Sequence, residues 1–514
     1  MNIFKKFTGA IVAAAVFILL FVACLYYGLR AKAFYMVTPG RTSSGMIDFS
    51  KTSVDSLVED YVNREMDRQI VISGTGAMKF YEWQLARAYD DASQSFDFSS
   101  AFSYIDAYLQ NTDYLVGDIE TTMAGAGKGT DTSIYGYGAN KDTNIFNTPE
   151  VLAQNLADAG FNMIATSNSH AMDSGSNGVV STIGYLDQAG LTALGTVKTA
   201  GDARYVMQNI HGLQTGFIAY TNAINVEDDA QAVTAQSGDD TQGDTASGDG
   251  STQGTSSDGT QSSDSQQDTG TGDNSQDNSI GDGTQDASAE DDSQDSTAGD
   301  GAVQQYALVN YLNHYDENAV AQMCAQVQQM KSEGAEIVVV SLSFESSTST
   351  VADDSEKNLA AQLVSAGADI IFGNNASVPQ SIDVFDTTDS EGQVKKAVAI
   401  YSMGNLLTAQ QYVDGTGNNR DMGMICNVEI TKSKTSVRVT GLEIIPVYSN
   451  WTSDDIVSIP VIEAYENPDN YANVLDAIYA SRVTDAYTTI FPGILQSSGL
   501  NYTIEDSKYK ISIE

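Results

Sequence analysis

One of the three histidines in the chain, His170, lies where chemistry is expected. It closes the polar run 167–170, which follows the short apolar stretch 161–166, and Asp173 comes three residues later. A polar cluster just past the carboxyl end of a buried strand is where open α/β sheets place their sites. Because an imidazole beside a carboxylate can act as a general base or a metal ligand, His170 and Asp173 are the candidate catalytic residues. The same residues also suit a turn in which Asn168 and His170 only satisfy backbone groups.

Short apolar stretches of strand length alternate with segments of helical spacing along the chain. The expected strands are 70–78, 161–166, 215–221, 336–342 and 370–372, and the expected helices include 182–189, 317–333 and 358–366. A helix is also expected to begin at Pro149 with Thr148 as its cap, and 306–311 has the pattern of a further strand. This alternation predicts an α/β fold.

Four segments resemble, in the same order, the site segments of the CapA family of capsule and poly-γ-glutamate synthesis proteins. They are YLVGDIETTMA (114–124), SNSHAMDSG (167–175), GADIIFGNNASVPQSIDVF (367–385) and VAIYSMGNLL (398–407). The resemblance covers two parts of one domain, 68–226 and 303–450. It implies a calcineurin-like metallophosphatase fold, which is a layered α/β/β/α sandwich, and a role in the synthesis of a capsule or a poly-γ-glutamate-type surface polymer.

Several metal-ligand positions implied by this resemblance are substituted. The family's opening Asp falls at Thr75, and its three missing histidines fall at Ser343, Asn375 and Ser377. A centre with two metal ions needs several carboxylate, imidazole and amide ligands that converge on both ions. The substitutions therefore argue against a dinuclear Zn or Mn site.

The implied metal ligands that this chain keeps are Glu120, Asn168 and His170. Asp118 stands where the family has Asn. Hard divalent cations are bound by carboxylate and carbonyl oxygens, so a single cation held by Asp118, Glu120 and Asn168 stays open as the one expected cofactor.

The residues that replace the histidines are small and polar rather than large and apolar. Burying an unpaired hydroxyl or amide costs roughly 1–3 kcal/mol, so retained polarity favours a wet cleft that can hydrogen-bond a ligand. We expect this ligand-binding cleft to be formed by Thr75, Asp118, Glu120, Asn168, His170, Ser343, Glu345, Asn374, Asn375, Ser377 and Asn405.

Two classes of function follow from the resemblance and its departures. The favoured one is a degenerate, non-catalytic CapA-like protein that binds an anionic cell-surface polymer or proteins of envelope synthesis. The alternative is a metal-dependent hydrolase with a reduced metal site, acting on a phosphoester or on the γ-amide of an anionic polymer. Such an activity would need a metal-activated water or a general base such as His170.

The first 67 residues have the composition of a membrane anchor and a stalk. Residues 9–29 are almost entirely apolar, long enough to cross a bilayer, and Lys5 and Lys6 precede them. We expect 1–32 to be a cytoplasmic tip with a transmembrane signal-anchor and 33–67 a membrane-proximal stalk, with the bulk of the chain outside the cell membrane. A signal peptide cleaved near residues 31–33 and a lipid attached at Cys24 are the alternatives.

Residues 227–302 interrupt the domain with Ser, Thr, Gly, Gln and Asp. The stretch has 19 acidic residues and no Lys or Arg, and the whole chain has a net charge of −42. It lacks the apolar residues needed to offset its ordering entropy, so it is predicted to be a disordered acidic loop. The acidic chain also makes nucleic acid an unsuitable partner. Residues 451–514 are expected to form a C-terminal extension.

Overall fold

The computed structural model describes residues 68–127, 136–140, 145–225, 306–345, 347–388, 392–410, 419–475 and 477–513. The expected anchor at 9–29, the stalk at 33–67 and the acidic loop at 227–302 lie outside these residues. Within the described part of the chain, no helix has both the length and the apolar character needed to cross a membrane. All described residues belong to one compact unit.

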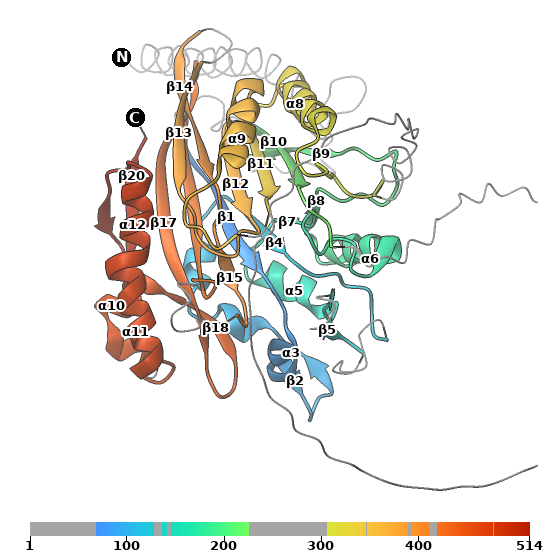
Figure 1. The fold of residues 1–514 in the computed structure, drawn as a ribbon, viewed down its shortest axis with the longest axis vertical. Coiled ribbons are helices and arrows are strands. Elements are labelled where there is room, and N and C mark those ends of the chain that lie inside the picture. Colours follow the sequence, from blue (N-terminus) through green and yellow to red (C-terminus); the bar gives the residue numbers. More distant parts are fainter. Residues whose placement is uncertain are drawn as a thin grey trace, which may run out of the picture. The chain divides into compact units, whose positions relative to one another are not determined.

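The first of two large sheets has ten strands and contains β1 (Arg68–Met78) near its centre (Figure 1). β1 pairs in parallel with β4 (Tyr114–Ile119), and the parallel arrangement continues through β7 (Met163–Ala165) to β8 (Thr192–Leu194). On its other side β1 pairs antiparallel with β16, which leads to β17, β20 and β19. The remaining strands of this sheet are β15 (Asn405–Leu407), β16 (Met422–Lys432), β17 (Val437–Trp451), β18 (Ile456–Pro460), β19 (Thr503–Glu505) and β20 (Lys508–Ser512).

The second sheet has six strands in the order β13-β14-β12-β11-β10-β9. Its four central strands run parallel, and the two edge strands are antiparallel to their neighbours. The strands are β9 (Tyr205–Ile210), β10 (Leu213–Thr221), β11 (Ile337–Ser343), β12 (Ile370–Asn374), β13 (Ile382–Thr388) and β14 (Val394–Ile400). Two short antiparallel pairs of strands lie outside the two large sheets. They are β2 (Tyr89–Asp90) with β3 (Ser95–Phe96), and β5 (Gly138–Asn140) with β6 (Ile145–Asn147).

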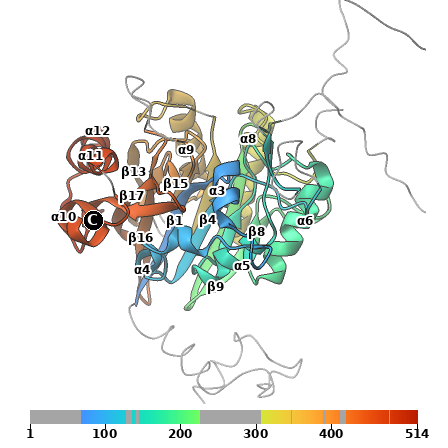
Figure 2. The same ribbon diagram turned by 90° about the horizontal axis from the view of Figure 1, so that it is seen from below.

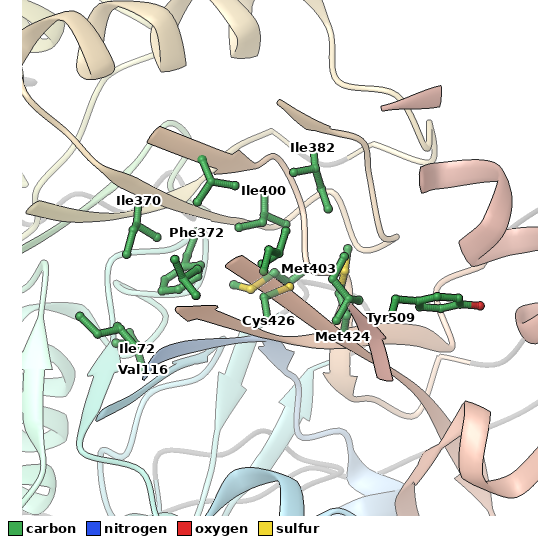
Figure 3. Packing of buried hydrophobic residues seen from close by; sticks show 14 of the residues in the cluster. Ile72, Val116, Ile370, Phe372, Ile382, Ile400, Met403, Met424, Cys426 and Tyr509 are labelled. Atoms are coloured by element: carbon green, nitrogen blue, oxygen red, sulfur yellow. The ribbon is translucent and has the colours of Figure 1, made fainter. Parts of the chain in front are cut away.

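The two large sheets pack face to face through one apolar cluster. Ile72 and Val116 from the first sheet meet Ile370, Phe372 and Ile400 from the second in this cluster, and all five are buried (Figure 3). The contact is close enough that a Cβ added to Gly74 would lie 2.7 Å from the ring of Phe372. The sandwich therefore brings the middle of β1 directly against the middle of β12.

Helices cover the outer face of each sheet. The first sheet packs against η1 (Ser99–Phe102), α4 (Asp106–Leu109), α5 (Val151–Asp158) and α6 (Gly175–Gln188), and the second against α8 (Glu317–Ser332) and α9 (Asp354–Ala366). A further short helix, α3 (Glu82–Ala88), follows β1. The predicted mixed α/β sandwich, with two sheets inside and helices outside, is therefore confirmed.

The C-terminal segment adds to this sandwich directly. β18 and β20 both pair with β17 of the first sheet. The helices of this segment lie beside the part of the sheet that contains β17 (Figure 2). The guanidinium of Arg482 is bidentate to the carboxylate of Asp421, with both distances 2.9 Å, and this joins the segment to the start of β16. The segment contains α10 (Val461–Glu466), η2 (Pro468–Tyr471), α11 (Ala477–Asp485), η3 (Ala486–Ile490) and α12 (Phe491–Ser497).

Two local expectations were wrong. Helix α5 begins at Val151 with Glu150 as its N-cap, because the Thr148 hydroxyl hydrogen-bonds to Thr121 Oγ1 at 2.8 Å instead of capping the helix. Residues 306–311 form a turn with two isolated bridges, to Thr196 and Thr221, rather than a regular strand.

Candidate functional site

The carboxyl ends of β1, β4 and β7 lie side by side because the three strands are parallel and their last residues pair with one another. Met78 pairs with Ile119, and Asp118 pairs with Ala165. The second sheet brings the end of β12 to the same place, where the Asn374 amide approaches the carbonyl of Thr75 at 3.4 Å. The polar residues that follow these strands therefore form one group, which we call the strand-end cluster.

A lysine lies within the strand-end cluster. Lys79 follows β1 directly and is 6% exposed, and its Nζ lies 2.7 Å from Glu120 Oε2. The same ammonium lies 3.3 Å from the hydroxyl of Ser377. Glu120 itself is fully buried, and Lys79 forms an ion pair with its carboxylate.

Asp118 and Asn168 form a second buried pair. The Asn168 amide donates to Asp118 Oδ1 at 2.9 Å and to the carbonyl of Ile119 at 2.7 Å. Burial and, to a lesser degree, the charge of Glu120 together raise the pKa of Asp118 to about 8, and the Asn168 hydrogen bond opposes the rise. Asp118 therefore holds its proton more tightly than an exposed aspartate does.

His170 is oriented by Asp173. Its Nδ1 lies 2.8 Å from Asp173 Oδ2, and its Nε2 points towards Glu120 Oε2 at 3.9 Å. The ring of Phe146 packs edge-on against the imidazole, with 4.6 Å between the ring centroids. A carboxylate on one ring nitrogen leaves the other directed at the site, as in histidines that act as general bases or metal ligands.

Two of the residues at the implied histidine positions hydrogen-bond to main-chain carbonyls. The Asn375 amide donates to the carbonyl of Phe344, and the Ser377 hydroxyl lies 3.4 Å from the carbonyl of Asn375. Asn375 and Ser377 both have positive φ, 77° and 61°, a conformation that Asn adopts more readily than most residues. The third such residue, Ser343, is buried on β11, and its hydroxyl has no hydrogen-bond partner among the described residues.

Asn405, the first residue of β15, also belongs to the strand-end cluster. Its amide donates to the carbonyls of Ser377 and Arg420, at 3.1 Å and 2.7 Å. The preceding Gly404 has φ 64°, and a Cβ there would lie 2.5 Å from the carbonyl of Met422, so only glycine fits this turn.

Glu345 is the one expected cleft residue that lies apart from the others. Its side chain is 52% exposed and contacts His314 Nδ1 at 2.9 Å and the Asn222 amide at 3.1 Å. The other ten expected residues are buried. Thr75 contacts the group through its carbonyl, since among the described residues its hydroxyl bonds only to the carbonyl of Gly76.

Sequence reasoning missed Lys79, Tyr81 and Arg420. Burial raises the pKa of Tyr81, the Glu120 carboxylate raises it further and Arg420 lowers it, so Tyr81 lies near both Glu120 and Arg420. The signal for Lys79 was its place immediately after the strand at 70–78. A lysine at a strand end is usually at the surface, so position alone would not have identified it.

The strand-end cluster does not fit a centre with two metal ions. Among the residues that the structure describes, no group of three or more His, Cys, Asp or Glu side chains is placed to hold a metal ion. A metal ion at Glu120 would also lie close to the Lys79 ammonium. Two unit charges 4 Å apart repel by about 4 kcal/mol at an effective dielectric of 20, and a divalent ion by about twice that.

The fold and the site together define an α/β sandwich with a buried polar cluster at its parallel strand ends. Residues 72–410 match the family described as bacterial capsule synthesis protein PGA_cap. This match covers more than half of the chain, so the protein belongs to that family, as the resemblance of its site segments to CapA proteins implies.

Comparison with solved structures gives a weaker similarity than the family match does. The chain is similar to the calcineurin-like phosphoesterase YfkN from Bacillus subtilis, with 11% identity and a TM-score of 0.33 over 84% of this chain and 100% of that one. No residue role follows from a likeness at this level. None of the curated proteins matches the chain.

Proposed function

We propose that this protein acts in the synthesis of a capsule or poly-γ-glutamate-type surface polymer as a non-catalytic binding or accessory member of its family. The observation that carries the proposal is the hydrogen bonding of the Asn375 and Ser377 side chains. Both stand where the resemblance implies metal-binding histidines, and both direct their polar groups to main-chain carbonyls. Side chains used in this way support the local backbone, and the Ser377 hydroxyl also contacts the Lys79 ammonium, which favours a site without a bound metal ion.

The proposed partners are an anionic cell-surface polymer or the proteins that make it, and the proposed location is the cell membrane. The apolar segment 9–29 with its preceding lysines supports a single membrane anchor with the bulk of the chain outside. A net charge of −42 makes nucleic acid an unsuitable partner.

Metal content and turnover test the proposal together. The full-length chain, purified in detergent, should contain less than about one tightly bound Zn or Mn per molecule, because too few ligands converge for a dinuclear centre. It should bind poly-γ-glutamate or co-purify with envelope proteins without shortening the polymer. Two stoichiometric metals with polymer or phosphodiester hydrolysis would overturn it.

A hydrolase with a reduced metal site is the second candidate, and the His170–Asp173 pair favours it. The imidazole is held by a carboxylate and directs Nε2 towards Glu120, so it could accept a proton from water. If this function holds, His170→Ala should abolish hydrolysis of a phosphodiester or of poly-γ-glutamate. If the non-catalytic function holds, the wild-type chain and His170→Ala should both be inactive.

A further inference from the structure

We propose that the Lys79 ammonium is the resident cation of the strand-end cluster and takes the charge-neutralising place of a divalent metal ion. The fully buried carboxylate of Glu120 needs a positive partner, because an isolated buried charge is strongly unfavourable. Lys79 Nζ supplies that charge at 2.7 Å from Glu120 Oε2. Its second contact, at 3.3 Å, is the hydroxyl of Ser377, a position where the resemblance implies a metal-binding histidine.

The backbone holds this lysine in place on both sides. Lys79 N–H donates to the carbonyl of Leu407 at 2.9 Å, and the Lys79 carbonyl accepts from the Gln84 amide at 2.7 Å. Gln84 is also buried, and its Oε1 accepts from the backbone N–H of Tyr81 at 2.8 Å. The turn after β1 is therefore fixed, and the side chain of Lys79 enters the cluster instead of extending into solvent.

Three further oxygen atoms of the strand-end cluster are of the kind that binds a hard cation. Glu120 Oε1, Asn374 Oδ1 and Asn405 Oδ1 are buried and accept no hydrogen bond from the described residues. Carboxylate and amide oxygens are the ligands of Mg²⁺, Ca²⁺ and Mn²⁺, whereas an ammonium needs only oxygen acceptors for its three N–H groups. The cluster is thus a cation site whose cation is covalently part of the chain.

Two consequences distinguish a resident cation from an ordinary buried ion pair. First, removing the ammonium alone should destabilise the protein, and neutralising Glu120 as well should restore much of the loss. Second, removing the ammonium and its bulk should open the site to a divalent cation that the wild-type chain does not bind. Neither consequence depends on the polymer, so the proposed function could fail while this inference stands.

The experiment measures the melting temperature of the full-length chain and its variants with and without MgCl₂, CaCl₂ or MnCl₂. Lys79→Met should lower the melting temperature by about 5–10 °C, because the buried carboxylate of Glu120 loses the ammonium that lies 2.7 Å from it. Lys79→Met combined with Glu120→Gln should recover at least half of that loss. Lys79→Ala should gain about 3 °C or more on addition of millimolar divalent cation, whereas the wild type should shift by less than about 1 °C.

Lys508 provides a matched control on the same sheet, far along the chain from the cluster. It is 9% exposed, and its Nζ lies 2.8 Å from Glu443 Oε2. Lys508→Ala also removes a buried lysine from a carboxylate, but Glu443 keeps a hydrogen bond from Asn427 and a contact with Lys510. It should therefore show no response to divalent cations.

Three results would overturn the inference. They are a wild-type chain stabilised by divalent cations as strongly as Lys79→Ala, a double variant no more stable than Lys79→Met, and a cation response equally large in Lys508→Ala. If Lys79→Ala does not fold even with divalent cation present, the comparison of Lys79→Met with the double variant decides alone.

Discussion

A single oxygen of Asp173 holds both the side chain of His170 and the backbone of Phe146. Asp173 Oδ2 lies 2.8 Å from His170 Nδ1 and accepts the backbone N–H of Phe146 at 2.7 Å. The carboxylate thereby fixes the imidazole and also the aromatic ring that packs on it. Burial raises the pKa of Asp173, and these two hydrogen bonds lower it.

This relationship predicts different effects for two substitutions of Asp173. Asp173→Ala leaves two buried donors unpaired and should lower the free energy of unfolding by about 2–3 kcal/mol. Asp173→Asn keeps one carbonyl oxygen that can accept both donors, so its loss should be about 1 kcal/mol or less. Urea denaturation measures both. Equal losses for the two variants would contradict the shared-acceptor geometry.

A buried carboxylate at the start of β12 predicts a large effect far from the site. Asp369 is 1% exposed, accepts the backbone N–H of Val338 at 2.9 Å, and pairs with Lys331 and Lys395 at 2.6 Å and 2.5 Å. Removing one partner of a buried ion pair leaves an uncompensated charge. Asp369→Ala should therefore lower the free energy of unfolding by about 3–5 kcal/mol in urea denaturation.

Asp386 is the matched control for this prediction. It lies 2.7 Å from the ammonium of Lys396, but its side chain is 75% exposed. Exposed pairs contribute little because water screens them, so Asp386→Ala should cost less than about 1 kcal/mol. Similar costs for Asp369→Ala and Asp386→Ala would show that burial does not decide the strength of these pairs.

The fold could be predicted in large part because its strands and helices are strongly patterned. The expected strand 336–342 corresponds to β11 at Ile337–Ser343, and the expected helix 317–333 corresponds to α8 at Glu317–Ser332. The errors lie where local signals were weak. The pair Thr148-Pro149 is typical of a helix start. The Thr148 hydroxyl, however, hydrogen-bonds to Thr121 and does not cap the helix.

The site could be predicted only in part, because its contacts join residues far apart in the sequence. His170 and Asp173 are neighbours on the chain, and their pairing follows from local spacing. Lys79 meets Ser377 across 298 residues, and no local pattern indicates that its ammonium is buried. Glu345 shows the opposite error, since it follows a strand end but turns towards Asn222 and His314.

Glu356 on α9 predicts a pH dependence of stability outside the site. It is 3% exposed and forms a capping box with Asp353, and burial raises its pKa to about 7. The carboxyl group therefore binds its proton more tightly in the folded chain than in the unfolded chain, where its pKa is near 4.5. Its contribution is favourable below about pH 4.5 and is lost as the pH rises to about 7.

Glu356→Gln isolates this contribution because the amide keeps an oxygen that can accept the backbone N–H of Asp353. Between pH 5 and 7 the free energy of unfolding of the wild type should fall relative to the variant by up to about 1.4 kcal/mol per pH unit. Denaturation at several pH values measures the difference. Parallel pH profiles for the two proteins would mean that the pKa of Glu356 is the same in the folded and the unfolded chain.

The last prediction concerns the acidic loop at 227–302. The chain segments on either side of it are already joined, since the backbone N–H of Thr221 donates to Asn310 at 3.0 Å and that of Leu312 donates to Thr221 at 2.8 Å. A short linker can therefore connect Asn225 to Tyr306. Loop-closure entropy grows with the logarithm of loop length, so a roughly tenfold shorter loop should stabilise the protein by up to about 2 kcal/mol.

Calorimetry of a variant with a short Gly/Ser linker in place of 227–302 tests this expectation. The variant should melt in one cooperative transition at or above the wild-type temperature, and its urea m-value should stay close to that of the wild type. An unchanged m-value would mean that the loop exposes no additional surface on unfolding and is no part of the folded core. A fall in melting temperature of several degrees, or loss of the cooperative transition, would show that residues 227–302 contribute contacts on which the sandwich depends.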